Sequence, residues 1–148
     1  MNITTRKATL ADMKAVRDLV VELAIYEKEP DAVTASLEDY QQDFNNGWFE
    51  CYLAEEAEQV VGMILYYNTY STWKGRMLYL EDFVVKQSHR RKGIGKLLFK
   101  ELFNVAQSKK TRLIKWQVLD WNKPAIEFYK SYQAIIEKEW YNCKIFID

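Results

Sequence analysis

Two adjacent carboxylates, Glu81 and Asp82, interrupt an apolar, β-branched and aromatic stretch near the middle of this chain. A carboxylate in the centre of a strand needs a reason, because burying its charge is costly. Either the acids form ion pairs with a neighbouring Lys or Arg, or they act as a base with a raised pKa or as an anchor for a cationic substrate. Successive side chains of a strand alternate, so we expect the two acids on opposite faces of the sheet.

The loop that follows this stretch has the composition of an anion-binding site. It reads Arg90-Arg91-Lys92-Gly93-Ile94-Gly95, and apolar spacing from Lys96 onward predicts a helix. A helix start offers unpaired N–H groups and the positive end of the dipole, and glycines let a phosphate approach the backbone. Basic glycine turns at helix starts are also common without a ligand, so both interpretations stay open. The spacing is neither that of a P-loop nor that of a dinucleotide fingerprint.

Two further polar side chains follow a later strand-like segment. Asn122 precedes an expected helix with Pro124 in its first turn, so it either caps that helix or bonds an amide of a ligand. Tyr129 lies within the same helix. Tyrosines in such helices usually pack against neighbours, but a phenol near a leaving thiolate would serve as a general acid.

Hydrophobic periodicity predicts the elements that must position these groups. Hairpins together with one βαβ unit predict an α/β (α+β) fold, whose mixed, largely antiparallel sheet has a central parallel pair and helices on both faces. We expect a single domain over residues 1–148. The expected strands are Ile3–Ala8, Trp48–Glu55, Gln59–Tyr67, Met77–Lys86, Arg112–Leu119, Ala134–Glu137 and Trp140–Ile147. The expected helices follow the Thr9/Asp12 capping signal, span Ser36–Asn46 and Gly95–Ser108, and begin at Asn122, and Thr69–Arg76 is expected to be a polar loop.

Composition narrows the possible partners. Lys+Arg and Asp+Glu both number 21, so no bulk charge indicates a nucleic-acid partner. Without a signal peptide or a membrane-length apolar run, we expect a cytoplasmic protein with no membrane partner. The two cysteines, Cys51 and Cys143, make neither a disulfide framework nor a zinc site, and both are expected to be buried.

Together these motifs resemble the GNAT superfamily of acetyl-CoA-dependent N-acetyltransferases, over nearly the whole chain. The run Arg90–Gly95 is similar to the family's Arg/Gln-x-x-Gly-x-Gly/Ala pyrophosphate loop. Ser71 stands where the polyamine enzymes carry an acid, so the chain looks more like the thialysine-acetylating members. The motifs that resemble the diamine (spermidine/spermine) and thialysine acetyltransferase branch are Tyr66-Tyr67, Trp73-Lys74-Gly75-Arg76, Tyr79-Leu80-Glu81-Asp82-Phe83, and Trp121-Asn122 with Phe128-Tyr129-Lys130.

The resemblance implies acetyl-CoA as co-substrate, no metal, a homodimer, and a role for each matching residue. Glu81 would take a proton from the substrate ammonium, and Tyr129 would protonate the departing CoA thiolate. The residues implied to contact the cofactor are Phe83, Val84, Val85, Arg90, Arg91, Lys92, Gly93, Ile94, Gly95, Lys96, Asn122, Lys123, Pro124, Ala125 and Tyr129. Those implied to line the amine site are Tyr26, Glu27, Trp73, Glu81, Asp82, Lys115, Trp116, Gln117 and Glu139.

The sequence therefore predicts acetyl transfer from acetyl-CoA to a primary amine by direct attack in a ternary complex. The expected acceptor is a small cationic molecule, a diamine, a polyamine or a thialysine- or lysine-like amino acid. An alkylammonium attacks only after deprotonation, and a nearby carboxylate both attracts it and accepts its proton. Two alternatives stay open: a protein or peptide amine as acceptor, and a non-catalytic acyl-CoA-binding module on the same fold.

Overall fold

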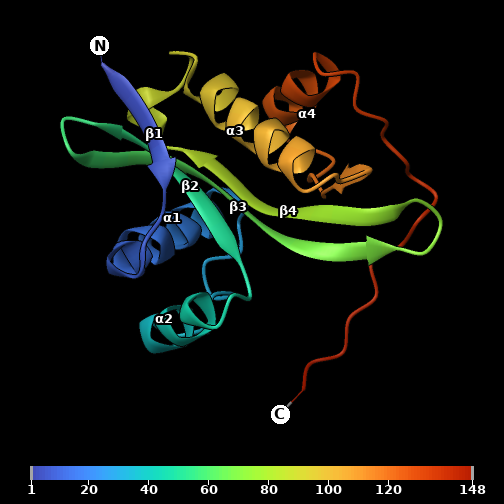
Figure 1. The fold of residues 1–148 in the computed structure, drawn as a ribbon, viewed down its shortest axis with the longest axis horizontal. Coiled ribbons are helices and arrows are strands. Elements are labelled where there is room, and N and C mark those ends of the chain that lie inside the picture. Colours follow the sequence, from blue (N-terminus) through green and yellow to red (C-terminus); the bar gives the residue numbers. More distant parts are fainter. Residues whose placement is uncertain (1, 148) are drawn as a thin grey trace. The chain divides into compact units, whose positions relative to one another are not determined.

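A mixed sheet with strand order β1-β2-β3-β4-β5 forms the centre of the computed structural model, which describes residues 2–147 (Figure 1). Neighbours from β1 to β4 are antiparallel, and β4 and β5 are parallel, as predicted. The strands are β1 (Ile3–Lys7), β2 (Glu50–Glu56), β3 (Gln59–Ser71), β4 (Gly75–Val85) and β5 (Leu113–Lys115). The helices are α1 (Met13–Tyr26), α2 (Leu37–Asn45), α3 (Ile94–Ser108) and α4 (Lys123–Lys130), with 3-10 turns η1 (Leu10–Asp12) and η2 (Gln87–His89).

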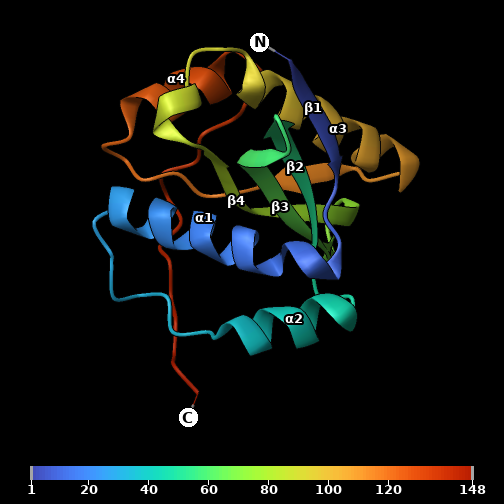
Figure 2. The same cartoon turned by 90° about the vertical axis from the view of Figure 1, so that its left-hand side faces the viewer.

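The chain divides into two compact units. The first, Met1–Gln117, contains the sheet with α1, α2 and α3, and the second, Val118–Asp148, contains α4. Within the first unit, α1 and α2 cover one face of the sheet and α3 covers the other (Figure 2). The predicted arrangement of helices on both faces is confirmed.

The core under α1 forms where apolar side chains recur at helical spacing. Met13, Val16 and Leu19 are buried against Leu53 and Leu65 of the sheet. Full burial of one such side chain contributes about 1.5–3 kcal/mol, so this stripe holds α1 on the sheet. The tip of α1 that this packing fixes carries Tyr26 and Glu27, two of the predicted site residues.

Local signals at the helix ends agree with the sequence. The predicted capping box of Thr9 and Asp12 is present, and Ser36 caps α2 by accepting a hydrogen bond from the backbone N–H of Asp39 at 3.0 Å. The last helical residue of α1 is Tyr26, and Lys28 follows in the left-handed region with φ 65°. That residue reverses the chain directly after Glu27, as left-handed residues do at many helix ends.

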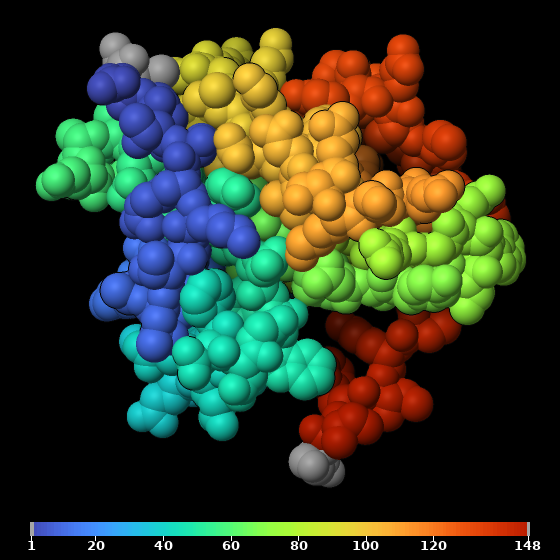
Figure 3. All heavy atoms as spheres, viewed as in Figure 1, coloured from blue at the N-terminus to red at the C-terminus, as the bar shows by residue number. Residues whose placement is uncertain are grey.

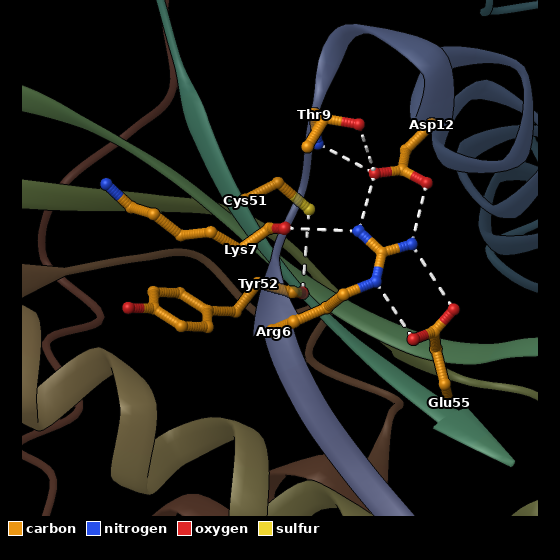
Figure 4. Close-up of polar contacts among 7 residues, drawn as sticks. All are labelled: Arg6, Lys7, Thr9, Asp12, Cys51, Tyr52 and Glu55. Atoms are coloured by element: carbon orange, nitrogen blue, oxygen red, sulfur yellow. Dashed lines mark hydrogen bonds and ion pairs between the residues drawn. The ribbon is translucent and has the colours of Figure 1, made fainter. Parts of the chain in front are cut away.

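A network centred on Arg6 connects β1 to β2, its neighbour in the sheet, and to η1, the turn that follows β1 in the chain (Figure 4). The guanidinium contacts Asp12 of η1 at 2.8 Å and Glu55 of β2 at 2.9 Å. The hydrogen bonds that Arg6 donates lower the pKa of Asp12 to about 2, and a hydrogen bond from the backbone N–H of Thr9 acts in the same direction. The network thereby fixes the edge strand and the start of α1 against the sheet.

The β3–β4 hairpin is longer than predicted. The segment Thr69–Arg76, expected to be a polar loop, is mostly strand, because β3 runs to Ser71 and β4 begins at Gly75. Cross-strand pairing, such as that of Thr69 with Met77, satisfies the backbone N–H and C=O groups of this segment. Polar side chains do not prevent such pairing. The yellow-green tip of this hairpin reaches the surface in Figure 3, where Trp73 is exposed.

The end of the chain departs furthest from the predictions. None of the described residues after α4 is in a strand, so the expected strands Ala134–Glu137 and Trp140–Ile147 are absent, and β5 is shorter than the predicted Arg112–Leu119. Apolar and aromatic content shows only that a segment suits a sheet, whereas a strand needs a neighbouring backbone to pair with. Cys51 is buried as expected, but Cys143 in this segment is exposed.

Candidate active site

A β-bulge places the two adjacent acids. Asp82 pairs with Leu65 and Leu80 pairs with Tyr66, which leaves Glu81 without a cross-strand partner. The extra residue interrupts the alternation of side chains along β4, so Glu81 and Asp82 face the same side of the sheet. The prediction that the two acids lie on opposite faces is therefore wrong. Burial, together with the charges of Asp82 and Glu81, raises the pKa of Tyr40 on α2, so both acids lie on the face covered by α1 and α2.

Three carboxylates, those of Glu27, Glu81 and Asp82, gather on that face. Burial and the charges of Glu81 and Glu27 raise the pKa of the half-buried Asp82 to about 7. Burial also raises the pKa of Glu27 at the end of α1. Within residues 2–147, no Lys or Arg forms a salt bridge with any of the three. The ion-pair explanation for the paired acids therefore fails, and the site is set to attract a cation.

Two tyrosines complete this carboxylate site. The hydroxyl of Tyr67 donates a hydrogen bond of 2.9 Å to Oε1 of Glu81, and the Tyr67 ring stacks on Tyr79 at 5.5 Å between centroids and 21° between planes. Both tyrosines lie in motifs noted in the sequence, but sequence reasoning gave neither a place in the site. Their contact depends on the cross-strand pairing of Tyr67 with Tyr79, which no local pattern encodes.

The basic loop before α3 has the backbone shape of an anion site. Arg91 and Gly93 both have left-handed φ values, 63° and 81°, on either side of Lys92, and Gly93 is the N-cap of α3. Such an alternation turns successive N–H groups toward one concavity, beside the positive end of the helix. A Cβ placed on Gly93 would meet nothing within 4 Å, so there is open space beside this turn. The residues present therefore fit a pyrophosphate.

Arg90 links this loop to the end of α1. Its Nε donates to the carbonyl oxygen of Val85 at 3.1 Å, and its guanidinium carbon lies 4.9 Å from the centre of the Tyr26 ring. Tyr26 is the residue next to Glu27. The anion loop and the carboxylate site thus share a boundary formed by Tyr26 and Arg90.

The parallel strands separate beside the bulge. Pairing of β4 with β5 ends at Tyr79 and Lys115, while β4 continues to Val85. The edge of β4 beyond Tyr79 is therefore no longer paired with β5, and an extended amide chain fits against such an edge. The ring of Phe83 packs on Phe99 at 5.1 Å and Val84 is buried, so these residues would offer backbone groups to a ligand.

Comparison with known proteins shows to which protein family this chain belongs. A model of the acetyltransferase (GNAT) family matches residues 13–133. This chain is a GNAT acetyltransferase. The family uses acetyl-CoA as co-substrate, which agrees with an anion loop beside a split in the sheet.

Named relatives of this GNAT acetyltransferase include a thialysine N-epsilon-acetyltransferase of Bos taurus, 38% identical over 95% of this chain and 90% of the relative. A spermidine/spermine N(1)-acetyltransferase-like protein 1 of Homo sapiens is 34% identical over 88% of this chain and 20% of that protein. Among solved structures, an aminoglycoside acetyltransferase from an uncultured soil metagenomic sample superposes with a TM-score of 0.82, covering 99% of this chain and 97% of that one at 18% identity. At that identity the last comparison shows the fold alone.

The second unit carries the other predicted residues of this acetyltransferase. Oδ1 of Asn122 accepts a hydrogen bond from the backbone N–H of Ala125 at 3.4 Å, and Pro124 lies in the first turn, so the capping role of Asn122 is confirmed. Tyr129 is buried within α4, where its ring lies 5.8 Å from that of Phe128. Its role as an acid stays a prediction.

The remaining predicted amine-site residues lie in three different parts of the chain. Trp116 lies edge-on to Phe99 at 6.0 Å, so its ring is on the α3 face of the sheet, away from the carboxylates. Lys115 ends β5, and Gln117 is the exposed end of the first unit. Glu139 is exposed in a segment without regular structure.

Proposed function

We propose that this enzyme transfers the acetyl group of acetyl-CoA to a primary amine of a small cationic substrate, of the thialysine, lysine-like or short diamine class. The observation that carries the proposal is the group of Glu27, Glu81 and Asp82 on one face, without a counter-cation among the described residues. An ammonium group would replace the missing cation. The name of the bovine relative supports the same class of acceptor.

The order of events follows from the acid–base requirements. Asp82 and Glu27 attract the ammonium, and Glu81, which is exposed and can exchange protons with water, takes one proton from it. The free amine then attacks the thioester carbon, and the bond to sulfur breaks. Tyr129 donates a proton to the leaving thiolate, a role that rests on the resemblance, and the second proton lost by the nitrogen returns through water to the Tyr129 phenolate. Positioning of the two substrates supplies much of the rate.

Acetyl-CoA supplies the activated acetyl group, and residues of three kinds would hold it. The nest of Arg91 to Gly93 and the start of α3 with Lys96 would take the pyrophosphate. The backbone of Phe83 to Val85 would pair with the pantetheine amides. The family resemblance further implies cofactor contacts for Asn122 to Ala125 at the start of α4.

Ser71 favours a short acceptor over a long polyamine. Its hydroxyl oxygen accepts a hydrogen bond from the backbone N–H of Lys74 at 3.1 Å, so it serves the hairpin turn and adds no charge. A long polycation would need carboxylates spaced along its length. The three carboxylates found here lie close together, since burial and the charges of Glu81 and Glu27 raise the pKa of Asp82. Such a compact group of acids suits a compact cation.

A panel of acceptors tests the proposal. Release of CoA is measured with thialysine, lysine, putrescine, spermidine, spermine and a lysine-containing peptide, and acetyl-CoA binding is measured separately by calorimetry. We expect the highest kcat/KM with the amino acids or the short diamine. Turnover of the peptide alone would indicate a protein acceptor, and acetyl-CoA binding without any turnover would indicate a non-catalytic module.

The substitution Glu81→Gln addresses the proton acceptor directly. We expect kcat to fall about 100-fold, with a changed pH–rate profile, because the amide cannot take up a proton. Glu58→Gln in the exposed β2–β3 turn is the matched control and should behave like the parent enzyme. An active Glu81→Gln variant with the parental profile would remove Glu81 from the mechanism.

A further inference from the structure

The Glu81 carboxylate would be free to rotate without Tyr67. It is exposed, its residue lies in the bulge without a cross-strand partner, and the bulge leaves its backbone outside the regular ladder. Among the described residues, the hydrogen bond of 2.9 Å from the Tyr67 hydroxyl is the one that holds the carboxylate. An exposed Glu side chain has several rotamers, and most of them would point away from a bound amine.

Tyr67 is itself held from two directions. Its backbone pairs with Tyr79 across β3 and β4, and its ring stacks on the ring of Tyr79. Its side chain is half-buried, and burial together with the hydrogen bond to Glu81 raises its pKa well above the usual range, so the phenol keeps its proton and remains a donor. The chain of contacts thus runs from the strand register, through the stacked rings, to the carboxylate.

We propose that Tyr67 is a positioning residue for acetyl transfer, whose hydroxyl holds Glu81 in the orientation from which it accepts the ammonium proton, while Tyr79 supports the Tyr67 ring. This inference rests on the proposed function, in which Glu81 is the proton acceptor. Tyr67 touches neither reacting atom. It acts through Glu81, and the loss of its hydroxyl should change only what Glu81 does.

The variant Tyr67→Phe removes the hydroxyl and keeps the stacked ring. We expect kcat to fall about 10-fold, in line with the loss of one positioning hydrogen bond, with the KM for acetyl-CoA unchanged. The pH–kcat/KM profile should also change, because the carboxylate has lost the donor that holds it in place. Tyr52→Phe, on β2 outside the site, is the matched control and should have the parental kcat and profile.

The pH profile belongs to a group of charges and not to one residue. The titratable and charged groups around Glu81 are Asp82, Glu27, Arg17, Tyr40, Tyr67 and Tyr79, from β4, α1 and its end, α2 and β3. Because these groups lie close together, the comparison is between whole profiles of matched variants.

A double variant separates positioning through Glu81 from any other role. In the Glu81→Gln background, adding Tyr67→Phe should cause no further loss of kcat. Tyr79→Leu, which removes the stacking partner, should reproduce the loss seen in Tyr67→Phe, whereas Tyr79→Phe should retain activity. Thermal unfolding of each variant shows whether the fold is intact.

Three results would overturn the inference. One is a Tyr67→Phe enzyme with the parental kcat and pH profile. Another is an equal loss from Tyr67→Phe in the parental and the Glu81→Gln backgrounds, because Tyr67 would then act independently of Glu81. The third is a fully active Glu81→Gln enzyme. In that case acetyl transfer to the amine panel would still stand, so the failure is distinct from a failure of the proposed function.

Discussion

At the scale of single residues, Asp82 shows how the site favours a cation. A pKa of about 7 means that the carboxyl is divided between its two protonation states near neutral pH. Burial and the neighbouring acids Glu81 and Glu27 cause this shift, and neither stabilises the empty site. Such an arrangement is typical of functional sites, in which residues needed for activity lower the stability of the folded protein.

This arrangement predicts a pH-dependent gain in stability for Asp82→Asn. The folded-state pKa of about 7 exceeds the ordinary value of 3.8, so between these values the folded protein binds more protons than the unfolded chain and stability falls as pH rises. We expect Asp82→Asn to exceed the parent in stability by about 4 kcal/mol at pH 8, with the difference nearly vanishing near pH 4. Urea unfolding at several pH values measures it, and a constant difference across that range would contradict the prediction.

Tyr129 provides the second prediction at this scale. If the phenol protonates the thiolate, Tyr129→Phe should lower kcat about 100-fold and leave acetyl-CoA affinity nearly unchanged, because the ring is kept. Single-turnover kinetics and calorimetry measure the two quantities. Tyr141→Phe, at an exposed position in the same unit, is the control. A parental kcat would leave Tyr129 with only the packing role that α4 already gives it.

At the scale of elements, the Arg6 network predicts an acid-sensitive contribution to stability. The pKa of Asp12 is about 2 in the folded protein against an ordinary 3.8, so its contribution is present above about pH 4 and is lost as pH falls through 2. Asp12→Asn should reduce the free energy of unfolding by about 2 kcal/mol at pH 7.

The exposed pair of Lys14 and Asp18 on α1 is the matched control for this network. Asp18→Asn should change stability by less than about 0.5 kcal/mol, because solvent screens the pair. Denaturant unfolding at pH 7 and near pH 2 compares the two variants. Equal effects of Asp12→Asn and Asp18→Asn would mean that the network does not hold β1 to α1.

At the scale of the whole molecule, the exposed apolar side chains of the last residues of the chain lead us to predict self-association. Trp140, Tyr141, Ile145, Phe146 and Ile147 are exposed, and a large exposed apolar segment usually contacts a partner. The expectation of a homodimer comes from the family resemblance, and a cytoplasmic location likewise stays a prediction. Sedimentation equilibrium should give twice the chain mass, and Phe146→Asp should shift it toward the monomer. A parent chain that remains monomeric at micromolar concentration would contradict the prediction.

Several local structures, including the turn before α3 and the start of α4, could be predicted because their signals lie within one segment. The capping residues Thr9 and Ser36, the loop Arg90–Gly95 and the Asn122 cap each depend on a few neighbouring residues. Such signals survive without any knowledge of the fold, because caps and turns satisfy backbone groups within the same segment. The family resemblance rested on the loop Arg90–Gly95 together with the aromatic and acidic motifs of β3, β4 and the start of α4, and the family match confirms it.

The tertiary structure decided what depends on pairing between distant segments. The bulge at Glu81 turned two acids that alternation places on opposite faces into one charged group, and the register of β3 with β4 brought Tyr67 to Glu81. The strands predicted after Ala134 did not form, because β-propensity cannot supply a partner. The sequence by itself determined the family and, with it, acetyl transfer as the kind of chemistry. The cross-strand hydrogen bonds, which no single segment contains, decided how the Glu81 carboxylate is held.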